Sequence, residues 1–464
     1  MRAVNIKTTL VSFLSIQDIT LYRGINEHGK AEIKGYIKSS EAEKYRMILL
    51  DDAWMEIWAA DETSENRIIF AGIVTAFSMQ TVEHNCLLQL TIMTGSYLMD
   101  IIPKYRSFQD GNSEYNDLFE VLNAEYENVG MIGDRGIYEK LEEFFLQYYE
   151  TDWKFAKRVI SKCGKFLTPS IHRTGIVYSF GIPDADRHDL PERIQFEMQK
   201  DLKSYREKLQ GGLAVSENDC IIVYFTDRDI YDLFDRIFLF GREMLVSKIE
   251  SKYVGQELLH TYTLQSEFSI QTCRIFGINH NGISLPGVVA DVKEDMVQVK
   301  LDNDGNHSQR TLRWFPFSTV YSSPDGTGWY FMPEIGDKVR LHIPEKNEEY
   351  AYVISAVHIR TPDERKNPDV KSLKTKYGKE IRFTPQSIVI TNNAGTSIEV
   401  SDSSGINIIS DKNVNISANE AISISSDSSS VTIAGDTDVT LQQSGASLTL
   451  DGDINMSGGD LRIH

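Results

Sequence analysis

Aliphatic residues recur in pairs over residues 388–464, and in each pair one polar or small residue separates the two members. Ten pairs follow one another every six to ten residues: Ile388-x-Ile390, Ile398-x-Val400, Ile406-x-Ile408, Val414-x-Ile416, Ile422-x-Ile424, Val431-x-Ile433, Val439-x-Leu441, Leu448-x-Leu450, Ile454-x-Met456 and Leu461-x-Ile463. This spacing is the period of a β-strand with one buried face, and the Ser, Thr, Asn, Asp and Gly between the pairs are typical of turns. A short, fixed period predicts one structural unit that is stacked many times.

One such unit is too small to be stable by itself. Fixing the backbone of about eight residues costs roughly 8–16 kcal/mol, whereas burial of two aliphatic side chains returns only about 3–6 kcal/mol. With only two inward side chains, each strand would form a very thin wall, which several copies wrapped around one axis could close. We therefore predict an intertwined, trimeric β-prism with a length of roughly 50 Å. No Phe, Tyr, Trp or Cys follows Phe383, as expected for a narrow axis filled by Val and Ile.

Upstream of this repeat, residues 1–275 have a mixed, aromatic-rich composition in which strand-like and helix-like patterns alternate. Alternation of apolar and polar positions predicts strands at 31–37, at 86–92 and again from 221 to about 264. Helical spacing predicts one helix capped by Ser113, a second capped by Thr151 and a third, charged helix over 202–208. We therefore predict an α+β part with two similar β-barrels and inserted helices in a chain that is mainly β.

Residues 276–360 read as a compact all-β stretch with frequent Gly and Pro. About five strands in this length are typical of a small Greek-key barrel of the OB type. Residues 361–376 are charged and contain two prolines, which predicts a linker. The β-prism then occupies residues 377–464, so we expect four successive parts along the chain.

Charge and cysteine content narrow the possible partners and compartments. The net charge of −19 argues against nucleic acid or an anionic membrane as the main partner. The four cysteines are widely spaced and form no CxxC motif, which indicates reduced core residues. Neither a signal peptide in the first residues nor an apolar run of transmembrane length is apparent, so we expect synthesis in the cytoplasm.

Short motifs follow one another over nearly the whole chain. They are NEHGKA at 26–31, IFAGIV at 69–74, GSYLMD at 95–100 with YRSFQ at 105–109, QYYETDWKF at 147–155, PGVV at 286–289, WFP at 314–316, GWY at 328–330, PEIGDKV at 333–339 and YGKEIRF at 377–383. Each is weak alone, but their order resembles the VgrG and phage late-control D family, the hub–spike proteins of contractile tails and type VI secretion. In that family such residues form turns, barrel corners and helix caps.

The resemblance implies a structural role at the centre of a baseplate. It implies a homotrimer whose hub, residues 1–275 with two tube-like barrels, adapts a threefold, membrane-piercing spike to a sixfold tail tube. The implied partners are the tail tube protein, baseplate proteins, a PAAR-like tip protein at the spike end and the target cell envelope. The particle could be a phage tail, a tailocin, an extracellular injection system or a type VI device.

We expect no catalytic residue and no cofactor. The stretch between barrel and prism is about 20 residues long, which leaves no room for an inserted lysozyme domain. Five aspartates of the repeat could suggest a glycosidase pair, but they are scattered turn residues, namely Asp436, Asp438, Asp451, Asp453 and Asp460. HExxH, GxSxG and glycine-rich phosphate loops are absent from the sequence.

His464 is the one candidate metal ligand. Three chains that meet at a tip would bring three imidazoles near the axis, which is a feasible metal site. Some phage spikes bind a metal through a paired His-x-His, and that pair is missing here. A frayed end or a platform for a separate tip protein is the simpler interpretation of this residue.

Three other functions compete with the hub–spike reading. An OB-type barrel with Trp314, Trp329 and neighbouring aromatics could bind single-stranded nucleic acid, but that requires a basic groove and the chain is acidic. A trimeric tailspike enzyme would need a carboxylate-lined groove and a polysaccharide substrate. A passive trimeric adhesin would leave the N-terminal motifs unexplained.

Overall fold

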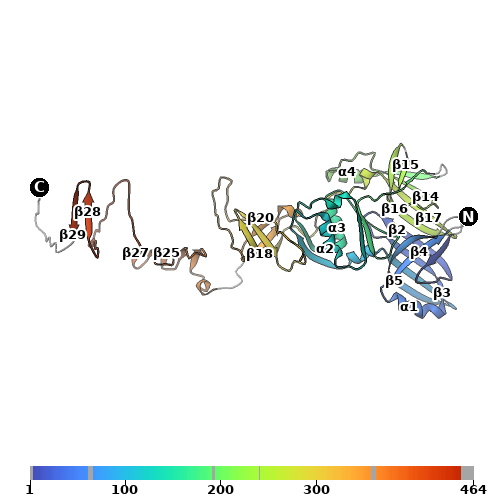
Figure 1. Cartoon of the computed structure of the whole chain (residues 1–464), viewed down its shortest axis with the longest axis horizontal. Helices are drawn as coiled ribbons and strands as arrows, with labels where there is room; N and C mark the ends of the chain where they lie inside the picture. Colours follow the sequence, from blue (N-terminus) through green and yellow to red (C-terminus); the bar gives the residue numbers. More distant parts are fainter. Residues whose placement is uncertain (1–3, 61–65, 191–193, 240, 357–361, 451–464) are drawn as a thin grey trace. The chain divides into compact units, whose positions relative to one another are not determined.

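The computed structural model describes residues 4–450 except 61–65, 191–193, 240 and 357–361. The chain divides into two compact units, Met1–Ile359 and Arg360–His464, which we describe separately (Figure 1). None of the described helices combines the length and the apolar character needed to cross a membrane.

Twelve strands of the first unit form one sheet with two halves. The first half contains β1 (Asn5–Thr8), β2 (Ser15–Gly24), β3 (Lys30–Lys38), β4 (Trp54–Ala60), β5 (Arg67–Val82) and β6 (Asn85–Met93), with α1 (Ala42–Leu49) between β3 and β4. The second half contains β12 (Arg187–His188), β13 (Phe196–Lys200), β14 (Ile221–Asp227), β15 (Arg236–Leu239), β16 (Arg242–Val254) and β17 (Glu257–Gln265). The strands predicted at 31–37 and 86–92 are confirmed as β3 and β6, which pair with each other.

The two halves are continuous because β2 and β16 pair antiparallel, from Gly24↔Lys248 to Thr20↔Lys252. The main path runs β1-β4-β5-β6-β3-β2-β16-β17-β14-β13. Apolar side chains at alternate positions of these strands are buried, as period-two alternation requires. The sequence predicted two similar barrels in this part of the chain. The structure places the strands of both segments in one twelve-stranded sheet, and the two barrels stay a prediction.

Along the sequence, a mixed insertion with the two helices α2 and α3 separates the two halves, and it lies beside them in Figure 1. Its elements are β7 (Pro103–Phe108), α2 (Tyr115–Asn123), β8 (Val129–Gly133), β9 (Phe145–Thr151), α3 (Asp152–Ser161), β10 (Leu167–Pro169) and β11 (Ile176–Phe180). The Thr151 cap is confirmed, since its side chain accepts a hydrogen bond from the backbone of Lys154. The Ser113 cap is wrong, because Glu114 occupies the cap and forms a reciprocal capping box with Asp117.

The predicted third helix is confirmed as α4 (Leu202–Gln210), and a short α5 (Glu267–Ile270) follows β17. The OB-type barrel then comprises β18 (Ile283–Lys293), β19 (Met296–Leu301), β20 (Trp314–Pro316), β21 (Lys338–Ile343) and β22 (Tyr352–Ile354). Its order is β20-β19-β18-β21-β22, and a parallel bridge between Phe317 and Val353 joins the two ends. This closure confirms the predicted five-stranded barrel.

The second unit begins with an antiparallel meander of β23 (Lys371–Lys374), β24 (Glu380–Phe383), β25 (Ser387–Thr391), β26 (Ser397–Ser401) and β27 (Gly405–Ile409). A hairpin of β28 (Val439–Gln443) and β29 (Ala446–Leu450) follows. Strand β23 lies inside the segment expected to be a linker. The pairs that begin at Val414, Ile422 and Val431 lie outside strands in the single chain, and the last two pairs lie outside the described residues.

Candidate functional site

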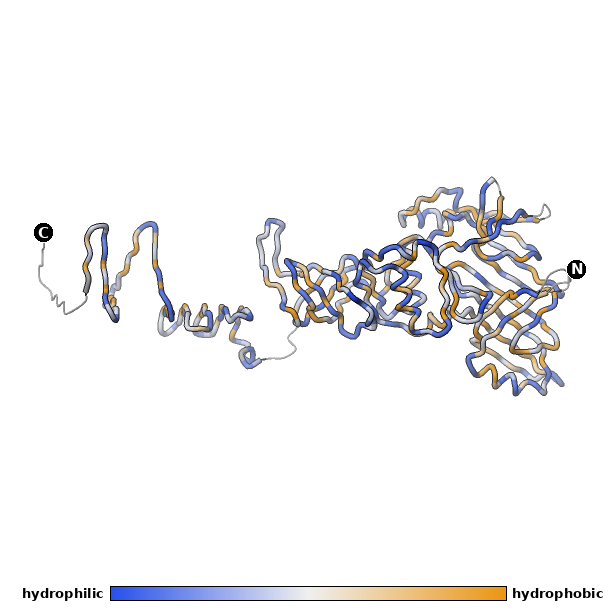
Figure 2. Tube along the Cα trace, viewed as in Figure 1, coloured by the Kyte–Doolittle hydropathy of each residue, from blue (hydrophilic) through white to orange (hydrophobic). Residues whose placement is uncertain are grey.

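The spike carries an aliphatic stripe, which we define as Ile388, Ile390, Ile398, Val400, Ile406 and Ile408 on β25–β27. The strand register places Ile388 opposite Val400 and Val400 opposite Ile406, so the pairs of successive strands align. All six side chains are between 42% and 69% exposed, whereas most strands of the first unit, β13 apart, bury their apolar faces. Figure 2 shows the alternation of hydrophobic and hydrophilic positions along this segment. The stripe is therefore an ordered apolar face that a single chain leaves uncovered.

Two sequence motifs of the first unit, YRSFQ and QYYETDWKF, meet Tyr126 in one buried polar network. The Arg106 guanidinium donates to Gln147 Oε1 at 3.0 Å and to Asp152 Oδ1 at 2.7 Å. Gln147 also donates to Asp152 Oδ1 at 2.8 Å, and the Tyr126 hydroxyl donates to Asp152 Oδ2 at 2.6 Å. The Arg106 and Asp152 side chains are 2% and 0% exposed. The network therefore fixes β7 to β9 and to the start of α3.

The YRSFQ motif at the end of β7 holds a loop of the barrel. The Ser107 backbone donates to Asp304 Oδ1 at 2.9 Å, and the Asn306 amide donates back to the Ser107 carbonyl at 2.8 Å. Two residues further on, the Gln109 backbone donates to Gln309 Oε1 at 2.9 Å. Side-chain hydrogen bonds thus hold the loop between β19 and β20 against β7. The sequence analysis found this motif but assigned it no contact, because its partners Asp304 and Gln309 lie about 200 residues further along the chain.

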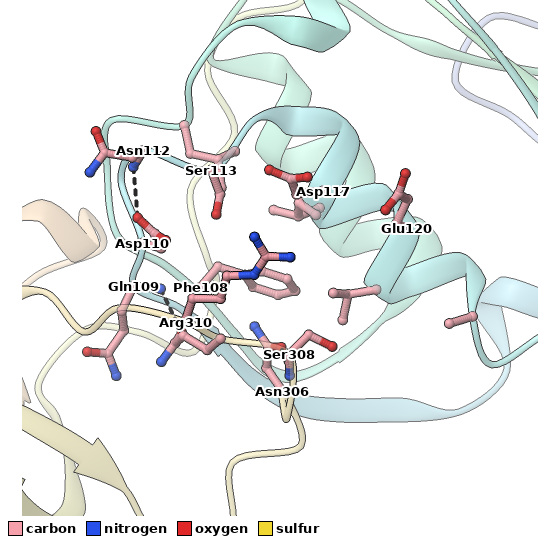
Figure 3. A pocket seen from close by; sticks show the side chains of 15 residues that line it. Phe108, Gln109, Asp110, Asn112, Ser113, Asp117, Glu120, Asn306, Ser308 and Arg310 are labelled. Atoms are coloured by element: carbon pink, nitrogen blue, oxygen red, sulfur yellow. Dashed lines mark hydrogen bonds between the residues drawn. The ribbon is translucent and has the colours of Figure 1, made fainter.

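A groove of about 470 Å³ opens beside this contact, between α2 and the loop of residues 306–310 (Figure 3). It is lined by Phe108, Gln109, Asp110, Asn112, Ser113, Asp117, Leu118, Glu120, Val121, Ala124, Leu141, Asn306, Ser308, Gln309 and Arg310. Its carboxylates already accept structural hydrogen bonds: Asp110 from the Asn112 backbone, Asp117 from the Glu114 backbone and Glu120 from the Asn116 amide. No histidine or cysteine is among these lining residues, so the groove offers no imidazole base.

One Ser–His–Asp constellation involves the NEHGKA motif. The Ser96 Oγ lies 2.8 Å from His28 Nδ1, and Asp100 Oδ2 lies 3.4 Å from His28 Nε2. A nucleophile must meet its substrate, yet Ser96 is fully buried and its hydroxyl also contacts Thr94 Oγ1 at 3.1 Å. This arrangement ties the β2–β3 turn to residues 94–100 and does not expose a reactive hydroxyl.

Metal-ligating residues do not cluster in the part of the chain that the structure describes. His464 and the aspartates at 451, 453 and 460 lie outside the described residues, so the tip site stays a prediction. Asp436 and Asp438 are exposed on the spike, as turn residues are.

Comparisons with known proteins agree with this architecture. Residues 285–358 match the family model described as the type VI secretion system/phage-baseplate injector OB domain. The Escherichia coli c3393 protein, described as a type VI secretion component with structural similarity to the T4 tail proteins gp27 and gp5, superposes with a TM-score of 0.53 at 12% identity. That match covers 76% of this chain and 100% of c3393. This chain has a VgrG-like hub–spike fold.

Two further matches come from structures of the Francisella PdpA–VgrG complex. The lidded complex gives a TM-score of 0.58 at 10% identity and covers 88% of this chain and 79% of the other. The half-lidded complex gives 0.57 at 9% identity and covers 88% and 87%. No curated protein sequence matches this VgrG-like chain.

A charge cluster in which only Arg23 is buried joins both halves of the VgrG-like sheet to the insertion. Asp232 Oδ1 accepts from Arg23 at 2.9 Å, Asp232 Oδ2 accepts from Arg67 at 2.5 Å, and His172 Nε2 lies 3.4 Å from Oδ1. Burial alone would raise the pKa of the Asp232 carboxyl, but the His172 hydrogen bond and the two guanidinium charges hold that pKa far below its ordinary value. One carboxylate therefore fastens three parts of the hub.

His260 beside this cluster predicts a pH-dependent stability. Burial, and then the charges of Arg23 and Arg67, lower the pKa of His260 to about 3. Between about pH 6.5 and pH 3 the unfolded state thus binds a proton that the folded state excludes. Stability should fall as the pH drops through this window, by up to about 1.4 kcal/mol per pH unit. Denaturant titrations at several pH values measure how the free energy of unfolding changes with pH. His260→Gln should reduce this change, whereas the exposed control His84→Gln should not. Equal pH dependence in both variants would show that His260 is not its source.

Proposed function

We propose that this chain is the structural hub and spike of a contractile injection baseplate, and that it acts as a homotrimer. The aliphatic stripe carries the proposal, since its six side chains are aligned and exposed in one chain. The same stripes of a second and a third copy would cover them. Burial of each such side chain is worth about 1.5–3 kcal/mol. Three copies around one axis would cover every stripe without a foreign partner.

The hub and the spike would then have different tasks. The sheet of residues 5–265, with its two halves in each chain, supports a ring in which three chains present six similar faces to a sixfold tail tube. The spike would pierce the target envelope when the tube advances, with its end available to a PAAR-like tip protein. Ten Asp and Glu against two Lys and Arg over 388–464 give the spike an acidic exterior that opposes lateral association. Baseplate proteins would bind the hub. The particle would be assembled in the cytoplasm and would carry the chain out of the cell.

Light scattering of the purified chain tests the assembly. The expected mass is three times 52.7 kDa at micromolar concentration, because the stripe cannot be buried in a monomer. A folded monomer at that concentration would refute the proposal. Electron microscopy of the particle would then show whether the trimer lies on the central axis of the baseplate or at the periphery of the particle.

The proposed role is not enzymatic. The Ser–His–Asp constellation has a fully buried serine, and the carboxylates of the groove beside α2 act as turn and helix caps. We therefore expect no turnover of peptidoglycan or envelope polysaccharide in assays of released reducing ends. Reproducible turnover that a single carboxylate substitution abolishes would favour the tailspike-enzyme alternative.

A further inference from the structure

A small cavity lies at the seam where the two halves of the hub sheet join. Ser251 of β16 pairs with Leu21 of β2 on one side and with His260 of β17 on the other. The cavity beside them has a volume of about 10 Å³, which is the space of one water-sized particle. The other polar side chains that line it are Arg23, Arg67, His172 and Asp232, and the rest of the lining is aliphatic. Both halves of the sheet and the insertion therefore meet at this point.

Two buried nitrogens at this cavity lack a hydrogen-bond partner among the residues that the structure describes. They are Nε of Arg23 and Nε2 of His260, whose residues are 5% and 2% exposed. The remaining nitrogens of both side chains are engaged. Arg23 donates through Nη1 to Asp232 Oδ1 at 2.9 Å, and His260 Nδ1 lies 2.7 Å from Ser251 Oγ. Because a buried polar atom without a partner costs free energy, the pair of nitrogens points to a ligand.

Positive charge exceeds negative charge around the cavity. The Arg23 and Arg67 guanidiniums share the Asp232 carboxylate, which accepts from them at 2.9 and 2.5 Å. Arg67 and Asp232 are partly exposed, so water screens their charges, whereas Arg23 is buried. Asp227 lies opposite His260 on β14 but does not line the cavity. A water molecule would leave the excess charge at Arg23 uncompensated, whereas an anion would neutralise it.

We propose that this cavity binds one monatomic anion of the size of chloride, held by the Nε–H of Arg23 and the Nε2–H of His260. In this site the Ser251 hydroxyl donates to His260 Nδ1, so the ring proton lies on Nε2 and is directed to the ion. Sulfate and phosphate are too large for the space. The ion would join β2 and β17 at the seam of the sheet. The proposal is independent of the proposed function, since all of its ligands belong to one chain.

Thermal unfolding of the full chain tests the site. Chloride is replaced stepwise by gluconate, a much larger anion, at constant sodium concentration. An anion that binds only the folded state raises Tm by mass action, so the Tm of the hub should rise with chloride and then level off. At about ten times Kd the increase should be about 2 °C, and bromide should act like chloride. A Tm that is independent of chloride, or that rises without levelling off, would overturn the proposal.

One substitution and a matched control locate the effect. Arg23→Met removes the Nε–H and the buried charge, and should abolish the saturable increase in Tm. Arg46→Met removes an exposed guanidinium of α1 that pairs with Glu43, and should leave the increase unchanged. A chloride effect of equal size in both variants would show that the ion binds elsewhere.

Diffraction with bromide tests the site in the natural chain, and so does not depend on the folding of a variant. Crystals of the full chain in sodium bromide should show one anomalous peak within hydrogen-bond distance of Arg23 Nε and His260 Nε2. A water molecule at this position, with no anomalous signal, would refute the anion site. A bromide peak without any chloride effect on Tm would mark an adventitious ion only, and would refute it as well.

Discussion

Ile424→Asp is expected to prevent trimer formation. In the proposed trimer each Ile424 faces the common axis, so the substitution introduces three carboxylates into one dry layer. An unpaired buried charge costs several kcal/mol, which exceeds what one layer of aliphatic contacts contributes. Ile424 is 69% exposed in the single chain, so the substitution costs the isolated monomer little. Light scattering should show monomers, and the spike should melt at a lower temperature than in the natural chain.

Ser423→Asp is the matched control for this experiment. It adds the same charge one residue away, and a strand with a two-residue period turns that side chain to the outer face. The control should remain trimeric and melt like the natural chain. Equal behaviour of the two variants, whether both assemble or both fail, would show that the aliphatic pairs do not face an axis.

Local patterns in the sequence were sufficient for most elements of this fold. Alternating residues predicted β3 and β6, and the polar residue before Asp152 predicted the start of α3. The Ser113 cap failed because Glu114 and Asp117 form a capping box one residue later, a competition between adjacent polar residues that spacing does not resolve. Such errors displace an element by a residue or two without changing the architecture.

The contacts that hold the elements together were not predictable in the same way. The run EEFFLQ at 142–147 gives no sign that Phe144 and Leu146 belong to one core and Phe145 to another. Arg106 and Asp152 are charged, so the sequence alone would place both at the surface. They are buried because they pair with each other, although 46 residues separate them in the sequence. The predicted boundary at residue 276 therefore separates the barrel from part of its own core.

Substitutions at the Arg158–Glu348 pair should have the second large effect. The Arg158 guanidinium donates to Glu348 Oε1 at 2.5 Å and to Glu150 Oε2 at 3.1 Å. Arg158→Met or Glu348→Leu alone breaks the first of these pairs, and loss of one partner of a buried pair typically costs up to about 3–5 kcal/mol. Glu150 remains as a partner of Arg158 in the second variant, so Glu348→Leu should cost less than Arg158→Met. The double variant replaces both charges by apolar side chains of similar volume and should recover most of that loss. Denaturant unfolding of the full chain measures the free energy of unfolding of the two single variants and the double variant. In this double-mutant cycle the coupling energy between residues 158 and 348 should exceed about 1 kcal/mol.

Measuring the same variants at several pH values distinguishes the contribution of charge pairing to stability from that of packing. Burial would raise the pKa of the Glu348 carboxyl, but the charge of Arg158 and the hydrogen bond from His280 lower it to about 2. Because the folded-state pKa lies below the ordinary carboxyl value of 4.5, the carboxylate contributes stability above that pH. This contribution is lost as the pH falls from about 4.5 to 2. The double variant should lack this part of the acid destabilisation, and a double variant with the natural acid profile would show that the pair does not carry it.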